Sequence, residues 1–158
     1  MPRLKITSAE IQKHLSLLAE TPRRIAASTT GLAELRLKTS PGDKKWSVVE
    51  LLAHLRACDD LWSHSIYAML TQDSPMLPLL DERRWAKTTR YASLEFQQSF
   101  QAFALKRGEL LRVLADLPEA VWARTASIEG RTHSVFSQAR RMALHEHEHC
   151  QQIEALCK

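Results

Sequence analysis

Apolar residues recur every three or four positions along four long stretches of this chain, and this spacing predicts four amphipathic helices. The first stretch covers residues 8–29. Thr7 stands immediately before it and Glu10 follows three residues later, which is the arrangement of a capping box. We therefore expect the first helix to begin at Ser8 and to end near Thr29.

The second stretch has the clearest helix start in the sequence. Ser47 and Glu50 have the spacing of a capping box. Trp46 before this cap and Leu51 just inside it have the spacing of a hydrophobic staple. One apolar face then continues along the stretch, made of Val48, Leu51, Leu52, Leu55, Cys58, Trp62, Ile66, Met69 and Leu70. We expect this helix to end near Thr71.

Two further helices are predicted, over residues 91–115 and from Ser134 as the cap to Cys157. The residues between them, 125–133, show no clear periodicity and are expected to form an irregular link. Four amphipathic helices in one chain indicate an all-α, four-helix bundle. The connection over residues 72–90 is long enough to cross the bundle, so a simple up-down-up-down order does not follow from the pattern.

The composition agrees with a single helical domain over residues 1–158. With 44% hydrophobic and 25% charged residues, the chain has the make-up of a folded globular protein. Its 158 residues are enough to bury a substantial core. It contains only 4 glycines and 6 prolines, fewer turn residues than an all-β fold normally needs.

Membrane and secreted proteins are the first classes that the sequence excludes. No apolar run approaches the roughly 18 residues of a spanning helix, and no apolar core of a signal peptide follows the first residues. Cys58, Cys150 and Cys157 are an odd number without the spacing of a disulfide framework. We therefore expect a reduced, cytoplasmic protein with no membrane partner.

The charge pattern also argues against nucleic acid as a partner. The net charge is +4, from 22 basic and 18 acidic residues mixed along the chain. No basic cluster exceeds two residues, so the sequence lacks the positive stripe that follows nucleic-acid phosphates. We expect a small-molecule substrate as a partner, and no nucleic acid.

Three of the seven histidines stand within residues 145–149, inside the last predicted helix. Positions four apart on a helix differ by only about 40° around its axis, whereas positions two apart differ by about 200°. His145 and His149 therefore share a face, and His147 points away from both. Apolar neighbours such as Ile153 lie on the same side, which puts the pair at the inner edge of the helix.

A histidine pair of this kind commonly presents two imidazoles to one metal ion, and a third ligand is expected from a facing helix. His54, beside the apolar face of the second helix, is the best candidate. Three imidazoles in one pocket would be costly unless a cation satisfied them. The alternative to a metal site is that these histidines are ordinary hydrogen-bonded residues at the edge of the core. For His64, His133 and His147 we expect exposure to solvent.

Several neighbours of these histidines could take part in the chemistry. Glu146 projects toward the centre of the inner face, where a carboxylate must be paired or hydrogen-bonded. It could be a catalytic general base, an acceptor for a ligand's N–H, or the partner of an arginine. Asp59 has a similar placement, and Gln152 could orient a bound water. Cys58, one turn after His54, could be a fourth ligand or a small core residue.

Two motifs of the chain resemble those of the DinB-like superfamily, also called DinB/YfiT. The run over residues 41–55, with Trp46, Ser47 and His54, is similar to the start of the family's second helix. The run over residues 143–153 is similar to the family's His-x-x-x-His-x-x-Gln-Ile ending. The likeness in order and spacing extends over most of the chain, and the combination of the motifs is more specific than either alone.

The resemblance implies a DinB-like, up-up-down-down four-helix bundle that is often a homodimer. It also implies a divalent metal, zinc or nickel in many members, held by one histidine of the second helix and two of the fourth. Those positions correspond to His54, His145 and His149. Some members are similar to S-transferases that use a low-molecular-weight thiol as cosubstrate, and others to metal-dependent hydrolases.

Three classes of function remain open. The first is a metal-dependent enzyme, either a thiol-dependent S-transferase or a hydrolase, in which the metal activates a bound thiol or water and Glu146 takes a proton. The resemblance, and not the residues, favours thiol transfer over hydrolysis. The second is a non-catalytic, stress-related bundle that binds a metal or a small molecule. The third is a bundle that serves only as an interaction or dimer module.

Overall fold

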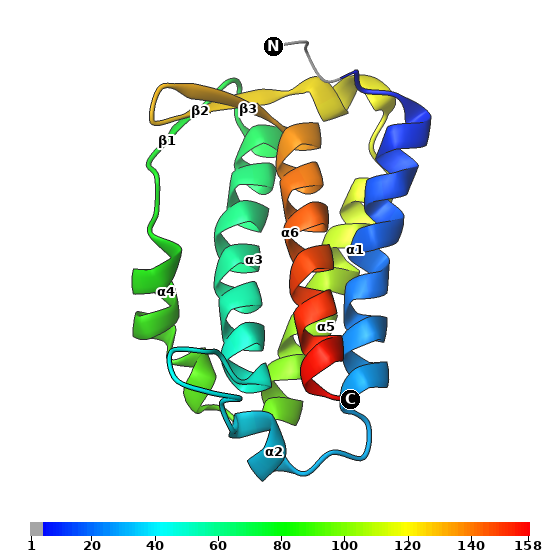
Figure 1. Cartoon of the computed structure of the whole chain (residues 1–158). Helices are drawn as coiled ribbons and strands as arrows, with labels where there is room; N and C mark the ends of the chain where they lie inside the picture. The colour runs from blue at the N-terminus through cyan, green and yellow to red at the C-terminus, as the bar shows by residue number, and fades with distance from the viewer. Residues whose placement is uncertain (1–4) are drawn as a thin grey trace.

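Four long helices form the frame of the computed structural model, which describes residues 5–158 (Figure 1). They are α1 (Ser8–Thr29), α3 (Val48–Thr71), α5 (Phe96–Ala115) and α6 (Val135–Leu156). Their bounds match the prediction except at the start of α5. The residues predicted as its first turn form a separate 3-10 helix, η1 (Tyr91–Ser93), and α5 begins only after Leu94 and Glu95.

Around the bundle the helices follow one another in the order α3, α5, α1, α6. In Figure 1, α3 and α5 run in one direction, and α1 and α6 run in the other. A polar contact crosses each of the four seams, for example Asp59 with Arg107, Leu18 with Arg107, Thr21 with Glu146, and His54 with His145. The all-α four-helix bundle is therefore confirmed. Around it, two neighbouring helices run in one direction and the next two in the other, while along the chain α1 and α3 are antiparallel (Figure 1).

Side-chain caps fix where three of the long helices begin. Thr7 Oγ1 accepts an amide of the first turn of α1 at 3.2 Å. Ser47 and Glu50 form a complete capping box at the start of α3, and Ser134 begins α6 in the same way. These bonds satisfy amides that have no partner within the helix. The cap of α3 places His54 in the second turn of that helix.

The connection between α3 and α5 contains a short helix, α4 (Glu82–Thr89), that lies outside the bundle beside α3 (Figure 1). Arg90, with a φ of 53°, ends α4 in the left-handed conformation. Asp60 on α3 anchors this segment, because its carboxylate accepts Trp85 Nε1 at 2.9 Å and the Tyr91 hydroxyl at 2.5 Å. These bonds hold α4 as an outer wall against α3.

A β-hairpin occupies the link between α5 and α6, where the sequence predicts irregular structure over residues 125–133. β2 (Thr125–Ile128) pairs antiparallel with β3 (Arg131–Ser134). Glu129 and Gly130 form a two-residue turn, and their positive φ angles of 47° and 75° match the twist of a hairpin. The prediction of an irregular link is wrong, because strands of four residues are too short for alternation to identify them.

Smaller elements lie at the two ends of the bundle. β1 (Met76–Leu77) joins β2 in parallel and completes a three-stranded sheet where α6 begins. The 3-10 helix η2 (Glu119–Ala123) precedes the hairpin. A further helix, α2 (Glu34–Lys38), lies at the opposite end (Figure 1). None of the helices in the described part of the chain combines the length and apolar character needed to cross a membrane.

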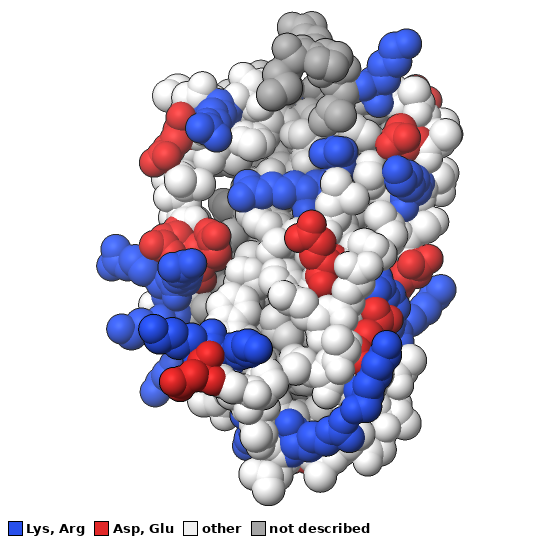
Figure 2. Space-filling view, in the orientation of Figure 1, with Lys and Arg blue, Asp and Glu red and all other residues white. Residues whose placement is uncertain are grey.

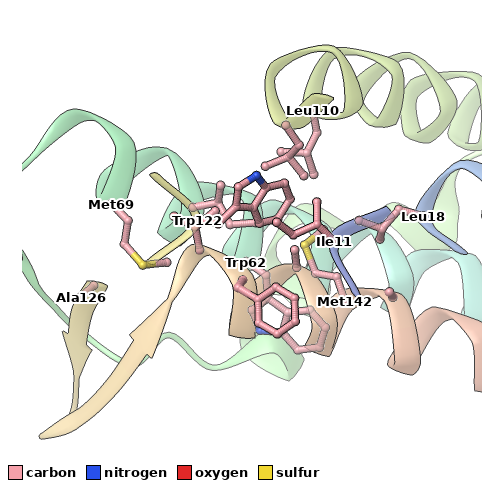
Figure 3. Close-up of a cluster of buried hydrophobic side chains, with 14 of the residues drawn as sticks. Ile11, Leu18, Trp62, Met69, Leu110, Trp122, Ala126 and Met142 are labelled. Atoms are coloured by element: carbon pink, nitrogen blue, oxygen red, sulfur yellow. The ribbon is translucent and has the colours of Figure 1, made fainter. Parts of the chain in front are cut away.

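The inner faces of the long helices meet in a hydrophobic core. Trp122, 2% exposed, is a large side chain of this core and lies amid residues from all four helices (Figure 3). Its labelled surroundings include Ile11, Met69, Leu110 and Met142. Apolar burial of this kind is the main favourable contribution to folding.

A buried ionic network joins all four helices. Arg107 of α5 is 1% exposed and donates to both carboxylate oxygens of Glu146 on α6, each at 2.5 Å. It also donates to Asp59 Oδ1 on α3 at 2.9 Å. On α1, the Leu18 carbonyl oxygen accepts from Arg107 at 3.1 Å, and the Thr21 hydroxyl donates to Glu146 at 2.8 Å. One guanidinium thus fixes α3 and α6, the helices that carry the candidate ligands, relative to each other.

Candidate metal centre

Three histidines converge at one point between α3 and α6. His145 Nε2 lies 3.0 Å from His54 Nε2 and 3.0 Å from His149 Nε2. His54 comes from the second turn of α3, and the other two stand one turn apart on α6. The structure therefore brings together the three side chains that the sequence singles out as ligands.

The tautomer of one ring is fixed by its neighbour. His149 Nδ1 lies 2.6 Å from Gln152 Oε1. An amide oxygen can only accept a hydrogen bond, so the proton of the His149 ring is on Nδ1. The Nε2 atom of His149 then presents a lone pair toward His145. Two imidazole lone pairs that face each other at this distance repel unless a proton or a cation lies between them.

The donor set fits a divalent transition metal. Imidazole nitrogens bind zinc at about 2.0–2.1 Å, and a tetrahedral site of that size separates its ligand atoms by about 3.3 Å. The two Nε2–Nε2 separations of 3.0 Å are close to that value. Within the described residues, the buried Nδ1 atom of His145 has no hydrogen-bond partner. A metal ion at the Nε2 atoms would leave this Nδ1 atom unpaired as well, so the Nε2 separations carry the fit to a metal.

Cys58 offers a fourth ligand atom beside the same point. Its Sγ atom lies 3.8 Å from His54 Nε2, one turn further along α3. The ligand atoms of His54, Cys58 and His145 all lie within 4.8 Å of one another. Burial raises the pKa of the Cys58 thiol to about 12. Without a cation, the thiol is therefore neutral at physiological pH and packs as a small apolar side chain.

Burial also keeps the imidazoles of His54 and His145 neutral. It lowers the pKa of His54, and the charge of His149 lowers it further. Burial lowers the pKa of His145 to about 3, with additional contributions from His149 and His54. Metal ions bind the neutral form of imidazole. At neutral pH, His54 and His145 are thus already in the protonation state that a metal requires.

Two tryptophans border the histidines. The ring centroid of Trp46 is 4.8 Å from that of His54 and 6.4 Å from that of His149. The ring of Trp62 meets His145 edge-on, with the centroids 4.9 Å apart. The sequence pattern assigned Trp62 only to the apolar face of its helix. Its position eight residues after His54, about two turns along the same face, is a signal that identifies it as a neighbour.

A cavity of about 540 Å³ opens beside the centre. His149 and Gln152 line it together with Trp46, Lys44 and Lys45. Figure 2 shows an area without Lys, Arg, Asp or Glu side chains on this face of the molecule, between α4 and α6. Since His149 itself borders the cavity, a small molecule can reach the histidines from solvent.

Glu146 is not among the residues grouped at this point. Its side chain lies on the inner face as predicted, but Arg107 holds both of its oxygens and Thr21 donates to one of them. Among the described residues, no hydrogen bond joins its carboxylate to the three histidines. Of the three roles expected for Glu146, the structure matches the partner of an arginine. A general base would have to leave this network.

The remaining histidines follow the sequence prediction in part. His64 is exposed, as predicted. His147 points away from the centre, but it is half-buried and its Nδ1 accepts from Arg24 Nη1 on α1 at 2.8 Å. His133 is half-buried in the hairpin, and burial lowers its pKa. Full exposure was wrong for these two because a neighbouring element covers each ring.

Comparisons with known sequences place these features in a family. The sequence model described as the DinB superfamily matches residues 17–153, a range that contains all three histidines. A protein of Geobacillus thermodenitrificans named "Putative metal-dependent hydrolase" is 25% identical over 122 residues, which cover 77% of this chain and 68% of that protein. A protein of Halalkalibacterium halodurans with a similar name is 26% identical over 87 residues, which cover 55% of this chain and only 51% of that protein.

A solved structure shares the architecture. YfiT from Bacillus subtilis, described as a probable metal-dependent hydrolase with an unusual four-helix bundle topology, matches with a TM-score of 0.84 and 19% sequence identity. The match covers 99% of this chain and 90% of the YfiT chain. A likeness at this level of identity shows that the two chains have the same fold.

Proposed function

The chain belongs to the DinB superfamily, and on this premise we propose that it is a metal-dependent hydrolase with a small-molecule substrate. The metal is held by His54, His145 and His149. Two relatives that carry a metal-dependent hydrolase name support the reaction class. The proposal for the ligands rests on this chain's own residues.

The convergence of three Nε2 atoms is the observation that carries the proposal. The distances of 3.0 Å from His145 to each of the other two rings suit ligands of one ion. Imidazole is a common ligand of both zinc and nickel, and either ion would satisfy the lone pairs that face each other here. Neither a hydrophobic cluster nor a chain of hydrogen bonds accounts for this orientation equally well.

The chain's residues prepare the centre for hydrolysis. Bound there with an open position, a divalent metal lowers the pKa of a water to about 7 and would activate a thiol in the same way. Gln152 Oε1 accepts a hydrogen bond from the Nδ1–H group of His149, which fixes the orientation of the ring. Trp46 and Trp62 cover the flanks of the rings and limit their contact with bulk water.

Thiol-dependent transfer is the second candidate function, and the size of the cavity beside His149 favours it. About 540 Å³ is enough space for a small substrate together with part of a low-molecular-weight thiol. Hydrolysis requires only water as the nucleophile, whereas transfer requires a thiol as the nucleophile in place of water. The two reactions therefore differ in their dependence on added thiol.

The test compares purified wild-type protein, made without a metal-affinity tag, with the variant His145→Ala. His64→Ala is the matched control for metal content, since this exposed histidine lies on α3 ten residues after His54. We expect roughly one metal ion per chain in the wild type and the control, and almost none in His145→Ala. Each protein is then assayed on a panel of esters and amides, with and without an added thiol.

Each outcome of this test is decisive. Hydrolysis that needs no thiol and disappears in His145→Ala supports the proposal. Turnover only in the presence of thiol assigns the transferase function to the same centre. Bound metal without turnover identifies a non-catalytic binder and contradicts the hydrolase. Unchanged metal content in His145→Ala overturns the centre itself.

A further inference from the structure

A second cavity, of about 470 Å³, lies beyond Trp62 toward the β-hairpin. Trp62 and Arg141 both line it. The Arg141 guanidinium is 4.6 Å from the centre of the Trp62 ring, and that ring in turn meets His145. Arg141 also stands one helical turn before His145 on α6. None of the three candidate ligands lines this cavity, defined here as the arginine cavity, and the Trp62 ring separates it from His145.

Two arginines are among the residues that line the arginine cavity. Arg131 and Arg141 line it, and both lie near His133, whose pKa they lower in addition to burial. Neither arginine forms an ion pair with a carboxylate in the described part of the chain. Glu82 and Glu129 also line the cavity. Since neither arginine is paired with these carboxylates, both can bind an anion from solution.

Gln138 supplies an independent indication of a ligand. Its side chain is 1% exposed and lines the same cavity, one turn before Arg141 on α6. Among the residues that the structure describes, its Oε1 atom has no hydrogen-bond partner. Buried polar atoms are rarely left unsatisfied in folded proteins. A donor of a bound molecule would satisfy this atom.

We propose that the arginine cavity binds the anionic end of the substrate. A carboxylate or phosphate pairs with Arg141, and an N–H group of the same molecule donates to Gln138 Oε1. A guanidinium suits planar, charge-assisted pairing with either anion. The contact of the Arg141 guanidinium with the Trp62 ring restricts its orientation. The inference rests on the proposed function, because the scissile bond of the same molecule has to reach past Trp62 to the histidines. The substrate class is then a small anionic amide or ester.

The test titrates four probes into the metal-loaded protein and follows the indole N–H signal of Trp62 by NMR, assigned with Trp62→Phe. N-acetylglycine carries both required groups, N-acetylglycinamide lacks the charge, and N-acetylsarcosine lacks the N–H. Inorganic phosphate distinguishes the two anions. We expect N-acetylglycine to bind about tenfold more tightly than the neutral amide, and more tightly than N-acetylsarcosine. Tighter binding of phosphate would support the proposal and assign the anion as phosphate.

Variants separate this cavity from the rest of the molecule. Arg141→Gln alters an exposed side chain, so the fold should be retained, and it should weaken binding of N-acetylglycine about tenfold while leaving the neutral amide unchanged. Arg140→Gln is the matched control, because this neighbouring arginine lines a different cavity. It should bind like the wild type. Gln138→Met should abolish the preference for N-acetylglycine over N-acetylsarcosine.

Several results would overturn the proposal. These are no binding of any probe, equal binding of charged and neutral probes, or unchanged affinity in Arg141→Gln. Loss of binding in Lys45→Gln instead would place the anion in the cavity beside His149. Failure of the proposed function has a different signature: turnover would be absent from the wild type or metal content unchanged in His145→Ala, while binding of N-acetylglycine and its loss in Arg141→Gln would remain. Binding that disappears with the metal and ignores Arg141→Gln would contradict the arginine cavity alone.

Discussion

At the scale of single residues, one buried histidine outside the candidate centre shows how burial affects protonation. His14 on α1 is 2% exposed, and its Nε2 atom lies 3.4 Å from Glu10 Oε2. In the described structure neither of its ring nitrogens makes a hydrogen bond, so this contact is too misaligned to be one. Burial lowers the pKa of His14, although the Glu10 carboxylate opposes the shift. Because His14 lies outside the candidate centre, its protonation can be studied without interference from a metal.

We expect His14 to make the protein less stable as the pH falls. Its pKa is about 6.5 in the unfolded chain and lower in the folded one, so below about pH 6.5 the unfolded state binds more protons. The free energy of unfolding then decreases by up to about 1.4 kcal/mol per pH unit from this group alone. In His14→Leu, urea denaturation at about pH 7 and about pH 5 should show a smaller decrease. Exposed His64→Leu is the control, and identical pH dependence of wild type and His14→Leu would contradict the expectation.

Helical spacing was sufficient to find the candidate ligands but not the role of their neighbours. His145 and His149 share a face because they are four residues apart, and His54 is the histidine beside the apolar face of α3. The same spacing placed Glu146 correctly on the inner face. It could not identify Arg107 as its partner, because spacing describes one helix and says nothing about the residue opposite. In the sequence, Arg107 looks like an ordinary surface charge of α5.

At the scale of elements, long helices could be predicted and short ones could not. The capping box at Ser47 and the periodic face after it specify α3 locally. β1 has two residues and exists only because β2 lies beside it. α4 has no buried residue and depends on Asp60 of α3 for its anchoring bonds. Elements that are stabilised by partners distant in sequence leave no periodic pattern of their own.

The relative placement of α3 and α6 depends on Arg107. We expect Arg107→Leu to lower the free energy of unfolding by about 3–5 kcal/mol, because Asp59 and Glu146 would remain buried without their counter-charge. Urea denaturation measures the change. Arg112→Leu, at an exposed position of α5, is the control and should change stability by about 0.5 kcal/mol or less.

A double variant tests the cause of that loss. Replacing Glu146 by Leu as well removes one of the buried charges, so Arg107→Leu combined with Glu146→Leu should be more stable than Arg107→Leu alone. If the double variant were less stable than the single one, packing around Arg107 and not the unpaired carboxylates would account for the effect.

At the scale of the whole molecule, the four-helix bundle and the elements outside it contribute to the candidate site in different ways. The four long helices hold the histidines, through contacts such as the one between His54 and His145. The elements outside the bundle shape the space around them, since the hairpin and the segment before α4 line the arginine cavity and the loop before α3 lines the cavity beside His149. Relatives with the same bundle can therefore differ in substrate through these connections alone.

The proposed metal should stabilise the whole fold and not only the centre. His54 and His145 are 91 positions apart in the sequence, so an ion that joins them binds the folded chain and has little affinity for the unfolded one. At a free concentration of about 100 times its Kd, it should add about 2.7 kcal/mol to the free energy of unfolding, or roughly 5–10 °C to the Tm of a chain of this size. Thermal melting with zinc and with EDTA measures this shift. His64→Ala should retain it and His145→Ala should lose it, whereas an equal shift in both variants would place the bound metal elsewhere on the protein.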